Sequence, residues 1–242
     1  MELNYYLLFI LALLAEIIGT VSGFGSSILF VPLASLFFDF NSVLGITAVF
    51  HVFSNISKIV LFKKGVDKRL ILKLGIPAVI FVIIGAILTK HIPQKESELL
   101  MNIMLVFFAF FLVYKINSPI EQNDRNLIIG GISSGFLAGL IGTGGALRGL
   151  TLAAFNLPKN IYISTSAIID LGVDLSRSIV YIYNGYFLTK YIIYIPFLIM
   201  ISVLGSWIGK IILTYISELY FKYIVIIIII ITCLFQVIKY FY

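Results

Sequence analysis

Charged residues are scarce in this chain. They make up 12% of its 242 residues, whereas soluble domains carry about 25%, and 61% of the residues are hydrophobic. The mean hydropathy is +1.11. A chain with so few charges lacks the polar surface that a water-soluble globule needs, so we predict an integral membrane protein with the lipid bilayer as its partner.

Cysteine and catalytic motifs are equally scarce. The single cysteine, Cys233, excludes an intrachain disulfide and a CxxC metal or redox site. No HExxH, Walker or nucleophile-elbow motif occurs, and no basic cluster has interleaved aromatic residues. We therefore expect no enzyme, no cofactor, no metal and no nucleic-acid partner. One alternative is a membrane enzyme or assembly factor that uses His51, Asp170 and Asp174 as metal ligands.

The apolar runs form two series of similar order. The first lies near residues 4–22, 26–38, 42–62, 69–89 and 98–115, and the second near 126–142, 145–157, 160–183, 188–213 and 219–238. A polar linker, 117–125, separates a first transmembrane repeat (1–116) from a second (126–242). A crossing needs about 20 helical residues, so the second run of each series is too short. We predict an all-α polytopic membrane protein with two pseudo-symmetric repeats, each containing a broken or re-entrant helix.

A glycine-rich break precedes each short run. The first reads Gly19-Thr-Val-Ser-Gly23-Phe-Gly25-Ser-Ser, and the second reads Gly139-Leu-Ile-Gly142-Thr-Gly144-Gly145-Ala-Leu-Arg148. Further along, polar residues match in the same register: His51 with Asp170, Asn55 with Asp174, and Lys58 with Arg177. Polar matches inside apolar runs are unusual by chance, so we interpret them as an internal repeat.

Loop charge predicts the orientation. The loop at residues 63–73 carries five basic residues against one acidic residue, and the matching connection at 184–190 has a single lysine. The positive-inside rule places the 63–73 loop in the cytoplasm of a multi-pass cell-membrane protein. The matching loop needs no positive charge if it lies outside, so the pattern favours inverted repeats.

The breaks are candidates for an anion site. Each short helix after a break begins with an N-terminus that carries about half a positive charge, and Arg148 adds a guanidinium that suits oxyanions. The predicted substrate contacts are Ser22, Gly23, Gly25, Ser26, Ser27, Thr143, Gly144, Gly145 and Arg148. Two alternatives remain: the glycines serve close helix packing, or Arg148 is permanently paired with an aspartate.

Ionisable residues in the third run of each series are candidates for proton coupling. Asp170 and Asp174 share one helix face, and His51 matches Asp170, so these three are the predicted coupling residues. Asn55 and Arg177 are predicted to support them. The alternatives are a static Asp174–Arg177 pair and a structural histidine, and Lys58 is predicted to extend to the membrane interface.

The motif Gly23-Phe-Gly25-Ser-Ser-Ile-Leu-Phe-Val-Pro32-Leu33, with its second copy, resembles the TauE/SafE family of membrane transporters. Ser26 and Ser27 stand where that family carries a longer glycine run, and Leu152 stands where it usually has proline. The resemblance implies export of sulfite or organosulfonates. The predicted function is a proton-coupled secondary transporter, monomeric or homodimeric, with alternating access around a midplane site. An anion channel or passive pore is the alternative.

Overall fold

The computed structural model describes residues 2–63, 65–115, 121–155 and 157–215, with scattered positions from 227 to 241. Every element assigned within these ranges is a helix, which confirms the all-α prediction. Part of the predicted linker (117–120) and most of the run 219–238 lie outside the described residues.

The described part of the first half contains three short elements, α2, α4 and η1, beside its longer helices. α3 begins after Asp39, whose carboxylate accepts a hydrogen bond from the Ser42 amide at 2.9 Å and so caps the helix. Helix resumes at Lys68, so the non-helical part of the predicted 63–73 loop ends at Asp67. The elements are α1 (Glu2–Ser22), α2 (Ser27–Ala34), α3 (Phe40–Leu61), α4 (Lys68–Leu70), the π-helical η1 (Ile71–Gly75), α5 (Ile76–Thr89) and α6 (Gln94–Lys115).

The second half follows a similar order. Asn123 caps α7 by accepting from the Asn126 amide at 2.8 Å, and Gly142, with a left-handed φ of 79°, ends the helix. The elements are α7 (Asp124–Ile141), α8 (Gly145–Ala153), α9 (Lys159–Tyr183), the 3₁₀-helical η2 (Thr189–Tyr194) and α10 (Ile195–Ile212).

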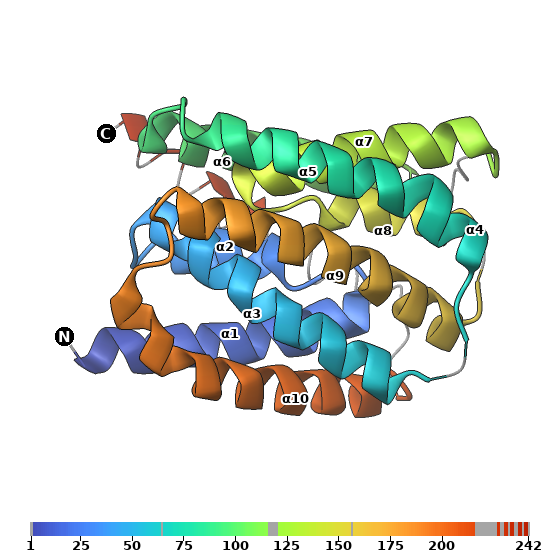
Figure 1. The fold of residues 1–242 in the computed structure, drawn as a ribbon, viewed down its shortest axis with the longest axis horizontal. Coiled ribbons are helices and arrows are strands. Elements are labelled where there is room, and N and C mark those ends of the chain that lie inside the picture. Colours follow the sequence, from blue (N-terminus) through green and yellow to red (C-terminus); the bar gives the residue numbers. More distant parts are fainter. Residues whose placement is uncertain are drawn as a thin grey trace.

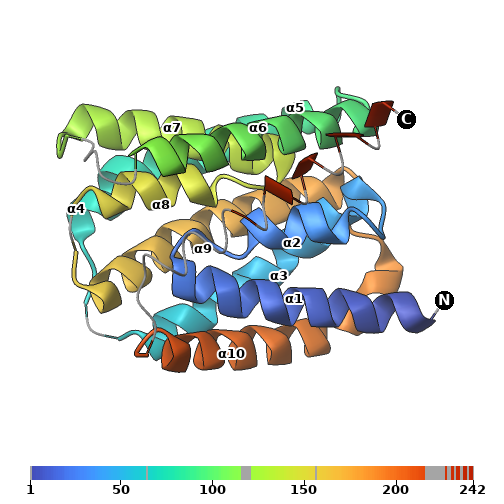
Figure 2. The ribbon, with the colours of Figure 1, turned by 180° about the vertical axis from the view of Figure 1, so that it is seen from behind.

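The long helices lie side by side along the long axis of the molecule (Figure 1). α1 packs on α10, α5 on α7, and α3 on α9, and α3 and α9 run in opposite directions (Figure 1). The two short helices, α2 and α8, lie behind α3 and α9 in the view of Figure 1 and in front of them in Figure 2. This places the ends of both breaks next to the polar residues of α3 and α9.

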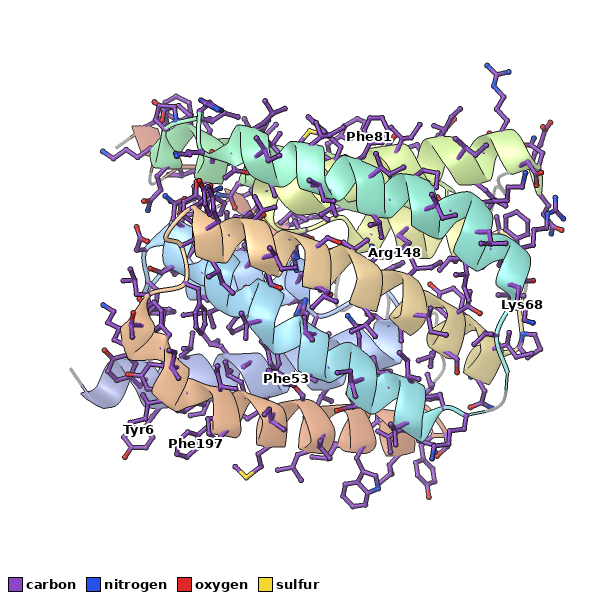
Figure 3. All side chains as sticks on the ribbon, viewed as in Figure 1. Tyr6, Phe53, Lys68, Phe81, Arg148 and Phe197 are labelled. Carbon is purple, nitrogen blue, oxygen red and sulfur yellow. The ribbon has the colours of Figure 1, made fainter. Side chains whose placement is uncertain are left out.

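Four helical stretches among the described residues are long and apolar enough to cross a membrane: Tyr5–Ser22, Phe40–Leu61, Lys68–Thr89 and Thr189–Ile212. Large apolar side chains cover their outer surfaces, and Tyr6 and Phe197 point away from the bundle whereas Arg148 lies within it (Figure 3). The outer surface of these helices is therefore apolar and charged groups such as Arg148 are enclosed by the bundle, which is the arrangement expected in lipid.

Glycines on α7 bring it close to α5. A Cβ at Gly131, Gly135 or Gly139 would overlap a backbone carbonyl of η1 or α5. The Thr89 hydroxyl also donates to the Gly139 carbonyl at 2.9 Å. Gly139, the first glycine of the second break motif, therefore serves close helix packing, as small residues often do between membrane helices.

Candidate anion site

Both predicted breaks interrupt the helices where the glycines lie. α1 ends at Ser22, and Gly23 and Gly25 adopt φ angles of 72° and 82° before α2 begins. In the second half, α7 ends one residue before Gly142, and α8 begins at Gly145. A positive φ is open to glycine but costly for residues with a Cβ, so glycine permits the chain to leave the helix at these points.

The N-termini of α2 and α8 meet at one buried cavity of about 20 Å³. α3, α9 and the end of α7 supply the rest of its wall. Most of the predicted site residues line this cavity: Gly25, Ser26, Ser27, Gly144, Gly145, Arg148, His51, Asn55, Asp170, Asp174 and Arg177. Three do not: Ser22 and Gly23 line a separate cavity, and Thr143 is buried but lines neither cavity. Two positive helix ends and a group of charged side chains therefore converge on one small space.

Arg148 is paired with Asp170 but incompletely satisfied. Its Nη2 atom forms an ion pair with Asp170 Oδ1, and Ser166 donates to Asp170 Oδ2 at 3.2 Å. The Nε and Nη1 atoms of Arg148 are buried and have no hydrogen-bond partner. Buried donors are nearly always satisfied in folded proteins, so this side of the cavity has capacity for an acceptor.

Asp174 has more partners than Asp170. It accepts hydrogen bonds from Arg177 Nε at 2.7 Å and from Asn55 Nδ2 at 2.7 Å. Arg177 also donates from Nη1 to the Gly142 carbonyl at 2.6 Å, at the end of α7. The geometry fits the alternative of a stable Asp174–Arg177 pair, which joins α3, α7 and α9.

His51 connects the two halves. Its Nε2 lies 2.9 Å from the Ser26 hydroxyl, and its Nδ1 lies 3.4 Å from Arg177 Nη2 and 4.0 Å from Asp174 Oδ2. Arg177 can only donate, so Nδ1 accepts and the proton of a neutral ring belongs on Nε2. His51 then donates to the Ser26 hydroxyl, which in turn donates to the Glu16 carboxylate.

Glu16 was not among the site residues predicted from the sequence. It is completely buried and accepts hydrogen bonds from the hydroxyls of Ser26 at 2.8 Å, Ser54 at 2.8 Å, Ser206 at 2.7 Å and Thr20 at 3.3 Å. The sequence does contain a pattern that could have identified it, because Glu16 is a carboxylate in the middle of the apolar run 4–22, one helical turn before Thr20.

Lys58 pairs with Glu16, and its predicted extension to the interface is wrong. The ammonium lies 2.9 Å from Glu16 Oε1 and donates to Ser54 Oγ at 2.9 Å. The residue is only 7% exposed. A nearby carboxylate offsets the cost of burying the charge, so the side chain turns inward.

The described residues contain no group of three or more histidine, cysteine, aspartate or glutamate side chains that could hold a metal ion. The carboxylates of the site are instead engaged by arginine, lysine, amide and hydroxyl donors. This donor set fits the recognition of an anion better than that of a cation.

A polytopic bundle that encloses charged side chains is the architecture of a membrane transporter. Residues 8–235 match the model of the family described as Sulfite exporter TauE/SafE, and the chain belongs to this family. A relative from Methanocaldococcus jannaschii, described as a probable membrane transporter protein, is 26% identical over 181 residues, covering 67% of each chain. No solved structure matches the chain.

Proposed function

We propose that the protein is a secondary transporter that exports a small sulfur-containing oxyanion, sulfite or an organosulfonate, coupled to protons. The observation that carries this proposal is the pair of buried donor atoms without acceptors on Arg148, Nε and Nη1, in the wall of the central cavity. Each such group costs about 1–3 kcal/mol when it is buried without a partner. An oxyanion offers several acceptors at once, and the guanidinium fork matches its geometry.

The charges around the cavity indicate how a proton would be coupled. The cations Arg148, Arg177 and Lys58 are balanced by Asp170, Asp174 and Glu16. A monovalent anion would leave one uncompensated negative charge unless a carboxylate takes up a proton. Asp170 is the carboxylate in the anion's place on Arg148, so its protonation releases the guanidinium. Proton and anion then bind with positive coupling and move in the same direction.

Alternating access would use the two halves as inverted repeats. The matched breaks, the antiparallel α3 and α9 (Figure 1) and the unequal charge of the matched loops support this arrangement. In it, the break between α1 and α2 and the break between α7 and α8 meet within the bilayer, and the 63–73 segment is cytoplasmic. The small volume of the central cavity, about 20 Å³, favours a carrier over an anion channel or passive pore.

The proposal is tested by efflux from proteoliposomes loaded with sulfite or ethanesulfonate. We expect saturable efflux that accelerates when the lumen is acidic, and its loss in the Arg148→Ala, Ser26→Ala double variant. The matched control is Arg69→Ala, which removes an exposed arginine outside the cavity. Unchanged efflux in the double variant contradicts the site, and non-saturating flux indicates a pore.

A further inference from the structure

A larger cavity lies at the end of the bundle where α1 ends and α9 begins. Its volume is about 250 Å³, and its wall includes Thr20, Ser22, Gly23, Ala153, Lys159 and Tyr162. Ala153 and Lys159 are exposed, so the cavity reaches the surface. Two of the predicted substrate contacts, Ser22 and Gly23, lie here rather than in the central cavity.

This cavity opens beside the basic 63–73 segment. Ser164, in the second turn of α9, donates a hydrogen bond to the Phe62 carbonyl. The Asp67 amide donates to the Thr165 hydroxyl at 3.0 Å. The start of α9 is therefore bound to the chain on both sides of Lys63, at the end of the bundle that carries Lys68 (Figure 3).

A further narrow space of about 20 Å³ shares wall residues with both cavities. It shares Thr20, Gly23 and Tyr162 with the larger one. With the central cavity it shares Gly25, Lys58 and Asp170. This narrow space therefore lies between the surface cavity and the Arg148–Asp170 pair, and Tyr162 and Lys58 both line it.

Tyr162 lines this narrow space and joins the first break to α8. Its hydroxyl lies within hydrogen-bond distance of the Gly23 carbonyl, at 3.0 Å, and of the Gly149 carbonyl, at 3.1 Å. One phenolic proton is shared between these acceptors. Gly23 belongs to the first break and Gly149 to α8 in the second half. The ring also lies directly on Gly23, where an added Cβ would be 2.8 Å from Tyr162 Cε1.

We propose that the 250 Å³ cavity is the vestibule through which the oxyanion enters from the side of the 63–73 segment, and that Tyr162 is its gate residue. The role of the vestibule rests on the proposed transport function. The gate opens when the Tyr162 hydroxyl releases the Gly23 carbonyl and the ring leaves the glycine surface. Lys159 is the cation in the vestibule wall, Lys58 is the first cation beyond the gate, and Arg148 lies deeper.

Cysteine labelling tests this route without requiring transport. In a Cys233→Ala background, Ala153→Cys reports on the vestibule, Ser166→Cys on the narrow space, and Val66→Cys on the adjacent loop. The probe is a membrane-impermeant sulfonated thiol reagent added to one side of oriented vesicles. We expect Ala153→Cys and Val66→Cys to react from the same side, and Ser166→Cys to react slowly from that side.

Tyr162→Phe removes the gate's hydrogen bonds while keeping its ring. Labelling of Ser166→Cys should then accelerate about fivefold, the effect of losing one net hydrogen bond, with Ala153→Cys unchanged. Tyr183→Phe, on the exposed end of the same helix, is the matched control and should change neither rate. Equal Ser166→Cys rates with and without the Tyr162 hydroxyl, or Ala153→Cys reacting from the opposite side to Val66→Cys, would overturn the proposal.

Measuring anion flux beside the cysteine labelling distinguishes a failure of the proposed gate from a failure of the proposed transport function. If the labelling pattern holds but the vesicles show no anion flux, the gate stands and the proposed function fails. If wild-type protein transports ethanesulfonate but the labelling pattern is absent, the transporter stands and the route through Tyr162 is wrong.

Discussion

The two halves of the molecule each bury an ion pair next to a helix break, but they satisfy it differently. Glu16 and Lys58 form the Glu16 cluster with Thr20, Ser26, Ser54 and Ser206, in which the carboxylate has five donors. Arg148 and Asp170 form the Arg148 pair, in which two guanidinium nitrogens have no acceptor. Both pairs bury charge, but only the Arg148 pair leaves buried donors without acceptors, and this difference is the reason that we propose the anion site at Arg148.

The difference follows from the elements that contribute donors. The Glu16 cluster draws from α1, α3, α10 and the first break, so its donors fix four segments around one carboxylate. The Arg148 pair involves only α8 and α9. Ser26 belongs to the cluster but also lies 2.9 Å from His51, so it joins the saturated region to the central cavity.

The largest expected effect is on stability, from Glu16→Gln. The substitution leaves the Lys58 ammonium buried without a counter-ion, which costs about 3–5 kcal/mol in comparable pairs. The midpoint of thermal unfolding in detergent should fall markedly. The double variant Glu16→Gln, Lys58→Met should lose less than the sum of its single variants because no unpaired charge remains. An unchanged midpoint in Glu16→Gln would show that the cluster does not anchor the first half.

Gly142→Ala should be the next most damaging change. Gly142 has a φ of 79°, and a Cβ there would overlap the Leu44 side chain. We expect a loss of about 2–4 kcal/mol, from left-handed strain together with overpacking. Gly185→Ala is the matched control, since its φ is 77° but nothing lies within 4 Å of the added Cβ. Equal losses in the two variants would mean that packing around the second break contributes nothing.

Asp170→Asn tests whether the Arg148 pair is a place for substrate. An ionised Asp170 competes with the anion for the Arg148 guanidinium, so removing this charge should strengthen anion binding. The affinity for ethanesulfonate should rise about tenfold, or about 1.4 kcal/mol. The measurement is binding of ethanesulfonate to purified protein.

The control for this variant is Asp124→Asn, which removes an exposed carboxylate outside the cavity. It should leave the affinity for ethanesulfonate as it is in the wild type. Weaker binding in Asp170→Asn would instead mean that the aspartate itself supports the anion, and the competition would be wrong.

Much of the helix pattern could be predicted because it is local. Apolar runs and glycines at 23, 25 and 142 fix where α1 and α7 end, and the structure interrupts the helices there. Arg148 was selected from its place after the second break, and Asp170 and His51 from matched positions in the third runs; the structure places all three in the wall of one cavity. These features depend on sequence spacing, which is visible before any tertiary contact forms.

The Glu16 cluster could not be predicted from the sequence in the same way. Its donors come from positions 26, 54 and 206, and only the packing of α1 on α3 and α10 brings them together. Lys58 was assigned to the interface because its distance from the helix end permits that. The carboxylate that draws it inward lies on another helix, so no local pattern could show it.

The smallest expected effect on stability comes from the exposed ion pairs at the start of α7, where Asp124 is the first residue. Asp124 lies 2.7 Å from Arg69 Nη2 and 3.2 Å from Lys73 Nζ, but all three side chains are largely exposed to solvent. Since exposed pairs contribute about 0–1 kcal/mol and are screened by salt, Arg69→Gln should barely move the unfolding midpoint. The change should diminish further in high salt. A loss as large as that of Glu16→Gln would show that charge pairing, rather than its burial and saturation, distinguishes the Glu16 cluster.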